Sequence, residues 1–273
     1  MNKSSFDKGR KVYFNGNYIG EKDAKISIFD SALMFGDMVF EMTRSFNKKQ
    51  FKLRDHIKRL LLGVKIYRIP LKLTEDELID ICNKTIEINE PFFEETDEHR
   101  LMINVSRGPL GIYAPVFDNK LEPTVIVADF PLKWTVQSMG KLYDEGINLV
   151  LVNQRAISGH LMDPKIKNRS RVFYQMANIE ASMFKGDNNW AVLMDEDGFI
   201  AEGSGDNIFI VKDGIVITPE PRNILVGISR NYIFELCKEL NIQCIEKNIT
   251  PYDLYAADEC FITGTPFSIL PVF

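Results

Sequence analysis

The sequence is poor in the residues that build metal centres and disulfide frameworks. Among 273 residues there are only three histidines, His56, His99 and His160, and only four cysteines. No histidine pair has the spacing of zinc ligands, and no two cysteines form a CxxC motif. We therefore expect no metal site, and we expect the four thiols to be reduced core residues in a cytoplasmic protein.

Long apolar runs and an excess of basic residues are also absent. No segment approaches the roughly 18–20 apolar residues of a membrane helix, and the N-terminal MNKSSFDKGRK lacks the apolar core of a signal peptide. The net charge is −5, and no basic stripe carries interleaved aromatic residues. These absences argue against a membrane protein and against a nucleic-acid partner.

The length and the irregular alternation of patterns predict a two-domain α+β protein. We place a smaller α+β domain at residues 1–130, an interdomain linker at 131–140, where neither helical nor strand periodicity fits, and a larger domain at 141–273. No GxGxxG or Walker A motif occurs, so dinucleotide and P-loop folds are not indicated.

Local patterns predict most of the individual elements. Asn15-Gly16 indicates a type I′ hairpin, and a second hairpin is expected from Met38-Val39-Phe40 through residues 47–49 to Phe51. Apolar spacing and capping signals predict helices at 54–68, 74–88, 172–184 and 228–240. The expected strands in the rest of the chain are 101–105, 123–128, 147–152, 190–194, 208–211, 215–218, 243–246 and 259–263.

Three features could together bind a cofactor that carries a phosphate and a protonated ring nitrogen. Lys167 lies in a basic segment that would favour its neutral, nucleophilic amine, and Glu202 could hold a ring N–H. Gly227 opens a helix whose main-chain N–H groups, with Ser229, could bind phosphate. Taken singly, each has an ordinary alternative: a solvated basic turn, an exposed turn acid and a simple helix cap.

Weaker signals come from three other places in the sequence. The segment Thr263-Gly264-Thr265 ends a predicted strand, and one of its threonines could reach the same phosphate. Arg59 has the bidentate fork that suits phosphate. Phe40 could line the apolar side of a pocket. A strand-end threonine, a solvated helical arginine and a core aromatic are the corresponding alternatives.

Taken together, residues 202–230 resemble the sequence pattern of the fold-type IV pyridoxal phosphate (PLP) enzymes, the class IV aminotransferases. The pattern is met by Glu202, Ser204, Asn207-Ile208-Phe209, Val216-Ile217-Thr218, Leu225, Gly227-Ile228 and Arg230. The resemblance continues in Phe14-Asn15-Gly16, in Phe35 to Glu41 and in Arg54 to Leu60, and so covers almost the whole chain.

This resemblance implies a D-amino-acid aminotransferase-like fold with PLP as cofactor, and it assigns roles to individual residues. Lys167 would form the Schiff base and act as the base, with Lys165 as a decoy two residues away. Glu202 would face the pyridine nitrogen. The remaining cofactor-binding positions that the resemblance assigns are Arg59, Ser204, Asn207, Gly227, Ile228, Ser229 and Thr265.

The implied activity is ping-pong transamination between an amino acid and a 2-oxo acid such as 2-oxoglutarate, in a homodimer. A branched-chain-like donor is favoured. D-amino-acid or (R)-amine transamination, aminodeoxychorismate lyase activity and PLP binding without turnover remain alternatives. Glu41 matches the residue that transaminases of this family carry at this position, whereas the lyases carry a threonine near this place. This favours a transaminase over a lyase.

The substrate positions depart from those of well-known members. Branched-chain transaminases usually carry a tyrosine and an arginine two residues apart, where this chain has Arg100 and Met102. Ile112 stands where D-amino-acid transaminases place an arginine. We take Phe40, Arg100, Met102 and Tyr113 as candidate substrate contacts. Family members commonly continue beyond the Thr265 segment, so the sequence leaves open whether the C-terminal domain is truncated at Phe273.

Overall fold

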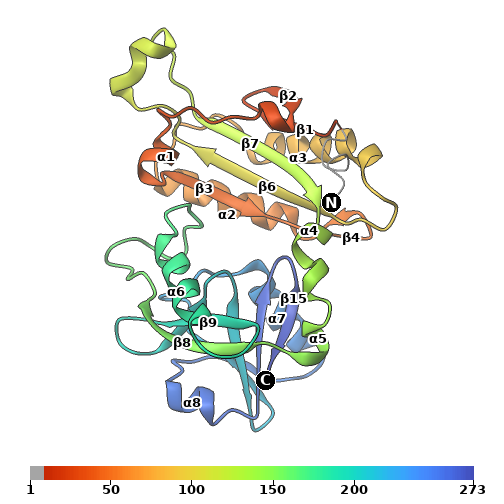
Figure 1. Cartoon of the computed structure of the whole chain (residues 1–273), viewed down its shortest axis with the longest axis vertical. Helices are drawn as coiled ribbons and strands as arrows, with labels where there is room; N and C mark the ends of the chain where they lie inside the picture. Colours follow the sequence, from red (N-terminus) through yellow and green to blue (C-terminus); the bar gives the residue numbers. More distant parts are fainter. Residues whose placement is uncertain (1–8) are drawn as a thin grey trace. The chain divides into compact units, whose positions relative to one another are not determined.

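The computed structural model describes residues 9–273, which form two compact units. Among these residues, unit 1 comprises 9–134 together with Ile166–Ser170, and unit 2 comprises Thr135–Lys165 together with Arg171–Phe273. The segment 166–170, which the sequence placed within the C-terminal domain, therefore packs with the N-terminal unit. Both units combine helices with mostly antiparallel strands, and the predicted α+β class is confirmed (Figure 1).

Unit 1 is built on one five-stranded sheet with the strand order β2-β1-β7-β6-β3. Its strands are β1 (Lys11–Phe14), β2 (Asn17–Gly20), β3 (Met38–Met42), β6 (His99–Ser106) and β7 (Thr124–Pro131), with a separate small hairpin of β4 (Ser45–Phe46) and β5 (Lys49–Gln50). Its helices are η2 (Glu21–Asp23), α1 (Ser31–Phe35), α2 (Leu53–Ile66), α3 (Glu75–Asn89), η3 (Glu90–Phe92) and η4 (Gly111–Phe117).

Turn chemistry explains the first hairpin but not the second. Asn15 and Gly16 both have positive φ, 44° and 90°, as a type I′ turn requires, and β1 and β2 pair around them as predicted. The hairpin expected from Met38 to Phe51 is wrong, because β3 pairs with β6 instead. The first four residues of β3 are buried, so the strand belongs to the central sheet, and only the short β4–β5 pair turns back.

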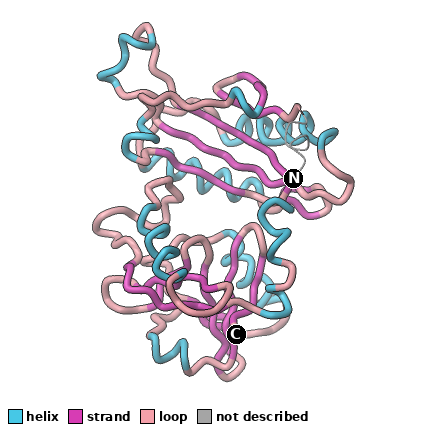
Figure 2. Tube along the Cα trace, in the orientation of Figure 1, coloured by secondary structure: helices cyan, strands magenta, loops and turns pink. Residues whose placement is uncertain are grey.

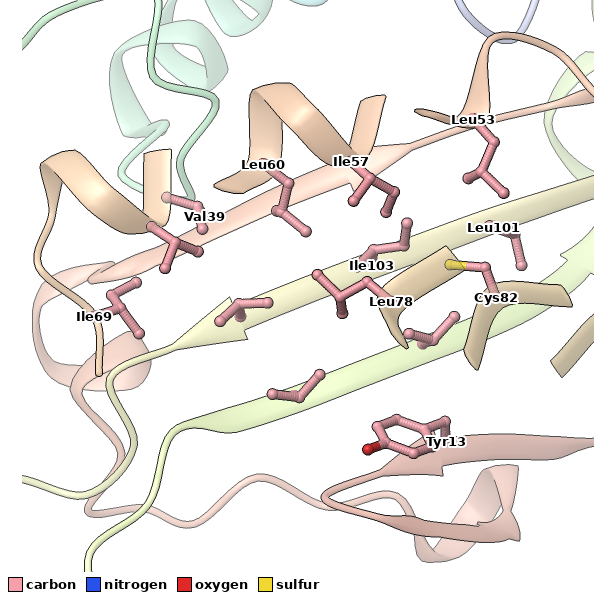
Figure 3. Close-up of a cluster of buried hydrophobic side chains, with 14 of the residues drawn as sticks. Tyr13, Val39, Leu53, Ile57, Leu60, Ile69, Leu78, Cys82, Leu101 and Ile103 are labelled. Carbon is pink, nitrogen blue, oxygen red and sulfur yellow. The ribbon is translucent and has the colours of Figure 1, made fainter. Parts of the chain in front are cut away.

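The core of unit 1 lies between the sheet and the two long helices, α2 and α3 (Figure 3). Ile57 and Leu60 of α2 face Leu101 and Ile103 of β6, and all four are almost fully buried. Side chains alternate between the two faces of a strand. Residues 101, 103 and 105 of β6 therefore face the helices, and residues 100, 102, 104 and 106 lie on the opposite face.

A fully buried histidine crosses one end of this core. His99 is in hydrogen-bond contact with Asp129 through Nδ1 (2.8 Å) and with Glu90 through Nε2, and its ring stacks on Phe93. Burial alone would lower the pKa of His99, but Asp129 and Glu90 outweigh it and raise the pKa. Burial also raises the pKa of Asp129 to about 6, against the opposing effect of His99. His99 and Asp129 therefore hold their protons more tightly in the folded chain than in the unfolded one, whereas the pKa of Glu90, which burial would raise, is lowered by its contact with His99.

We expect His99→Gln to destabilise the protein most below neutral pH. A raised histidine pKa stabilises the fold fully below the unfolded pKa, and the contribution disappears as pH rises through the folded pKa. Loss of one partner of a buried charged pair costs roughly 3 kcal/mol. Urea unfolding of the apoprotein at several pH values measures the difference, with exposed His160→Gln as control. If the difference in unfolding free energy between the parent and His99→Gln stayed constant from acidic to alkaline pH, the raised pKa assigned to His99 would be contradicted.

Unit 2 contains a five-stranded sheet with the order β13-β12-β11-β14-β15 and a three-stranded sheet with the order β10-β9-β8. Figure 2 shows strands in magenta and helices in cyan. Its strands are β8 (Asn148–Arg155), β9 (Asn189–Met194), β10 (Ile200–Gly203), β11 (Asn207–Lys212), β12 (Ile215–Thr218), β13 (Cys244–Glu246), β14 (Glu259–Gly264) and β15 (Ser268–Val272). Its helices are η5 (Gln137–Met139), α5 (Leu142–Glu145), α6 (Val172–Ser182), α7 (Ile228–Glu239) and α8 (Pro251–Tyr255).

Residues 131–140 are more ordered than the predicted irregular linker. They include the last residue of β7, then α4 (Lys133–Val136) and η5. Single helical turns are too short to produce a recognisable period, which is why the sequence pattern missed them. Within residues 9–273, no helix combines the length and the apolar character needed to cross a bilayer, and no cluster of three potential metal ligands occurs.

Candidate cofactor and substrate site

Lys167 lies on a short extended segment that runs along the outer edge of β3. The N–H of Phe40 donates to the carbonyl of Lys167 (2.9 Å), and the N–H of Arg169 donates to the carbonyl of Met38 (2.9 Å). Because side chains alternate along an extended backbone, Lys167 and Arg169 share one face and Asn168 takes the other. This pairing attaches the segment 166–170 to unit 1.

The face opposite α2 and α3, here called the lysine face, carries the predicted substrate residues of the sheet. The ring of Phe40 lies 4.9 Å from the Lys167 Nζ and 3.7 Å from the Arg169 Cζ, measured to the ring centre. Met102 and Arg100 belong to the same face of β6 by alternation. Burial lowers the pKa of Arg100 to about 10, and its guanidinium lies 5.7 Å from the ring of Phe130.

Arg59 and Glu41 meet on the helix side of the sheet. Arg59 donates to the two oxygens of Glu41 through Nε (2.6 Å) and Nη2 (2.9 Å), and His56 Nδ1 is 2.8 Å from the same carboxylate. Burial would raise the pKa of Glu41, but the charge of Arg59 and then that of His56 bring it to about 2. The interpretation of Arg59 as a merely solvated arginine is therefore wrong, since this carboxylate holds it in a bidentate pair.

Glu202 occupies a buried position in unit 2 and accepts three hydrogen bonds. Tyr174 donates to Oε1, while Asn207 Nδ2 (3.2 Å) and the Leu225 N–H (2.9 Å) donate to Oε2. The side chain is only 3% exposed, so the alternative of an exposed turn acid is wrong. A buried carboxylate kept in one orientation by three donors is suited to hold a cationic ring N–H.

Tyr174 was not identified from the sequence, where it looks like one more apolar position of a helix. Burial and then the charge of Glu202 raise the pKa of Tyr174 well above its usual value, so the phenol stays protonated and keeps donating. Arg171 lies over its ring, 4.3 Å from the centre, and donates to the Ser204 carbonyl (2.7 Å). Arg171 thereby connects the backbone carbonyl of Ser204 to Tyr174, which is a hydrogen-bond donor to Glu202.

Tyr174→Phe is expected to lower kcat by about tenfold and to leave the fold intact. A hydrogen bond to a charged group contributes roughly 1.5–3 kcal/mol, and part of this is recovered when the carboxylate reorients. The pH dependence of kcat should shift as well, because Glu202 loses one donor. Tyr255→Phe, at a ring that is 83% exposed, is the matched control. A kcat and a pH profile both equal to those of the parent would refute the positioning role.

The start of α7 has the properties of an anion site. Gly227 is the N-cap, as predicted, and no side chain caps the helix there. A Cβ at Gly227 would collide with Asn207 Oδ1, so a larger residue there would displace this amide. Thr263 pairs with Asn207 across β11 and β14, and its buried hydroxyl has no hydrogen-bond partner among residues 9–273. The buried acid, the uncapped helix start and this hydroxyl fit a cofactor with a ring N–H and a phosphate.

Asp206 is a second buried carboxyl that the sequence did not reveal. Burial and then the nearby charge of Glu202 raise the pKa of Asp206 to about 7, although the Gly205 N–H opposes this. A Cβ on Gly203 would collide with its Oδ1, so a larger residue there would displace the carboxyl group. Asp206 is therefore partly protonated near neutral pH, which limits the negative charge around Glu202.

The remaining predicted residues are placed as follows. Thr265 lies in the turn after β14, and Ile228 and Ser229 form the first residues of α7. Tyr113 lies in η4, where its ring packs 4.5 Å from that of Phe29. None of the contacts described above joins Tyr113 to the lysine face, so its place in substrate binding stays a prediction.

Comparison with known proteins identifies the family. Residues 38–273 match the family model described as Amino-transferase class IV. The chain belongs to the class IV aminotransferases. It is thus a PLP-dependent transaminase of the fold-type IV group, as its sequence resemblance implied.

Similar proteins are found in both sequence and structure. A putative branched-chain-amino-acid aminotransferase of Methanocaldococcus jannaschii is 38% identical over 265 residues, 96% of this chain and 87% of that protein. The branched-chain aminotransferase of Thermoproteus uzoniensis with norvaline has a TM-score of 0.83 at 31% identity, over 96% of this chain and 86% of that one. The T.th. branched-chain amino acid aminotransferase complexed with N-(5′-phosphopyridoxyl)-L-glutamate has a TM-score of 0.83 at 27% identity, over 97% and 85%.

Proposed function

We propose that this transaminase moves an amino group from a branched-chain amino acid to a 2-oxo acid such as 2-oxoglutarate. The observation that carries the proposal is the lysine face, where Phe40 lies within 5 Å of the Lys167 amine and Met102 shares the same face. An apolar surface beside the reacting amine favours an aliphatic side chain over a polar one. The names of the similar proteins, with norvaline and a glutamate adduct among their ligands, support the same substrates.

The residue roles follow from the chemistry of each side chain. Lys167 would hold the cofactor and move the proton of the substrate Cα, and Glu202 would hold a proton at the ring nitrogen. When bound, PLP supplies the ring that withdraws electrons from Cα. Arg59, Gly227, Ile228, Ser229 and Thr265 would bind its phosphate. Asn207 would support Glu202 directly through its side-chain amide. Ser204 would support it indirectly, through the hydrogen bond between its backbone carbonyl and Arg171.

A panel of amino donors tests the proposal. The purified holoenzyme is given L- and D-leucine, L- and D-valine, a simple amine or aminodeoxychorismate, with 2-oxoglutarate as acceptor, and glutamate formation and pyruvate release are measured. We expect glutamate from the L-branched-chain donors. Turnover of only D-amino acids or the amine, or pyruvate release from aminodeoxychorismate, would replace the proposal by the corresponding alternative.

We also propose that the chain acts as a homodimer. The segment 26–35 and η4 lie together, since the Leu110 N–H donates to the Phe29 carbonyl (3.2 Å) and Phe29 contacts two rings of η4. Large apolar side chains are exposed on both segments: Ile28, Leu33, Phe35, Ile112 and Val116. Contiguous apolar surface of this kind is typical of protein interfaces. Sedimentation of active enzyme as a monomer would contradict this proposal.

A further inference from the structure

Arg169 lies two residues after Lys167 and on the same face of the sheet. The two backbone hydrogen bonds to β3 fix this segment, so both side chains project onto the lysine face. Lys167 Nζ and Arg169 Cζ lie 4.9 and 3.7 Å from the centre of one ring, that of Phe40. The two positive groups are therefore no more than about 9 Å apart.

Two side chains of the lysine face contact the guanidinium of Arg169. The Oδ1 of Asn104 accepts from both Nε (3.0 Å) and Nη2 (2.7 Å), and the ring of Phe40 supports its flat face. Asn104 is 5% exposed, so its amide is itself fixed by burial. Because Asn104 occupies the Nε–Nη2 edge of this planar group, a carboxylate would be recognised at its Nη1–Nη2 edge.

The substrate of a transaminase carries its carboxylate on the same carbon as its amino group. A carboxylate bound at Arg169 would bring this carbon toward Lys167, and the alkyl side chain would remain beside Phe40. We propose that Arg169 recognises the carboxylate of the substrate, and that Asn104 and Phe40 position its guanidinium for this. The inference rests on the proposed function for the choice of an aliphatic substrate.

A second effect of Arg169 has to be separated from carboxylate recognition. A positive charge near Lys167 also disfavours the protonated amine and could act on the reaction without touching the substrate. Binding of an unreactive acid distinguishes the two, because it involves no proton transfer. The probe is 4-methylvaleric acid, which has the carbon skeleton of leucine without the amine, and the matched ligand is its neutral amide.

The experiment compares holoenzyme variants by calorimetry. Arg169→Gln should weaken binding of the acid by about 100-fold and leave the amide unchanged within a factor of three, as expected for loss of a charged bidentate pair. Arg169→Lys, which keeps the charge but loses the fork, should weaken the acid less. Asn104→Ala should have a smaller effect of the same kind. Exposed Arg68→Gln is the control, and thermal melting verifies that each variant is folded.

Two results would overturn the inference. One is unchanged acid binding by a folded Arg169→Gln, and the other is an equal loss of acid and amide. Transamination of leucine by the parent enzyme is measured separately. If the parent binds the acid through Arg169 but does not accept branched-chain donors, the proposed substrate fails and the carboxylate role of Arg169 stands.

Discussion

Replacing Lys167 by alanine is expected to reduce turnover by about 10⁴-fold, the upper range for loss of a positioned base that is also the covalent anchor. The lysine is held on the edge of β3 by the hydrogen bond from Phe40 to its carbonyl, with its amine over the Phe40 ring. No other lysine is fixed on the lysine face by these hydrogen bonds. Single-turnover kinetics measure the loss of the base, and the visible absorption of the lysine-bound cofactor measures the loss of the covalent anchor.

Lys165→Ala is the matched control for this prediction. Lys165 lies two residues before Lys167, but its side chain is about half exposed and its Nζ is 3.8 Å from Asp163. We expect this variant to keep full turnover and the visible absorption. The assignment would be reversed if Lys165→Ala lost the absorption while Lys167→Ala retained it.

Glu202→Gln is expected to lower kcat by about 10³-fold, in the range measured for loss of one electrostatic group at a reacting centre. A neutral amide cannot hold a proton on the ring nitrogen, so the ring withdraws electrons less effectively. Gln fits the same volume, and its amide can still contact Asn207 and Leu225. The loss should therefore appear in kcat, with the thermal unfolding temperature changing little.

The control is Glu239→Gln, at an exposed position on the last turn of α7. Absorption spectra recorded against pH add a second measurement, because the protonation of the bound cofactor should change only in the Glu202 variant. An unaltered spectrum together with an unaltered kcat in Glu202→Gln would remove the carboxylate from the mechanism.

Local patterns predicted the elements whose stability is local. The type I′ turn at Asn15-Gly16 was correct because it needs two residues with positive φ. The capping box at Thr74 and Glu77 was correct because it is formed within four residues. The partner of β3 was not predictable in this way. Its pairing with β6 joins residues sixty or more positions apart and depends on burial against α2, which a turn signal does not report.

The residues of the candidate site also differ in whether a sequence pattern or only the tertiary structure reveals them. Lys167, Glu202 and Gly227 could be named as candidates from residue type, but only the resemblance to the family pattern separated them from ordinary turn and cap residues and added Asn207. Tyr174 could not be named, since a helical tyrosine has no distinctive spacing, and only the tertiary structure brings it to Glu202. Asp206 was missed because its raised pKa comes from burial.

The route of the chain through 166–170 also bears on biosynthesis. The outer edge of β3 is covered only when Phe40 and Met38 bond to residues 167 and 169, which are made after β8. An N-terminal fragment ending at Trp134 would expose these backbone groups as an edge for pairing with other chains. On the ribosome, the N-terminal unit therefore stays open to misassociation until the lysine segment has emerged, and the residue that defines the chemistry also completes the sheet.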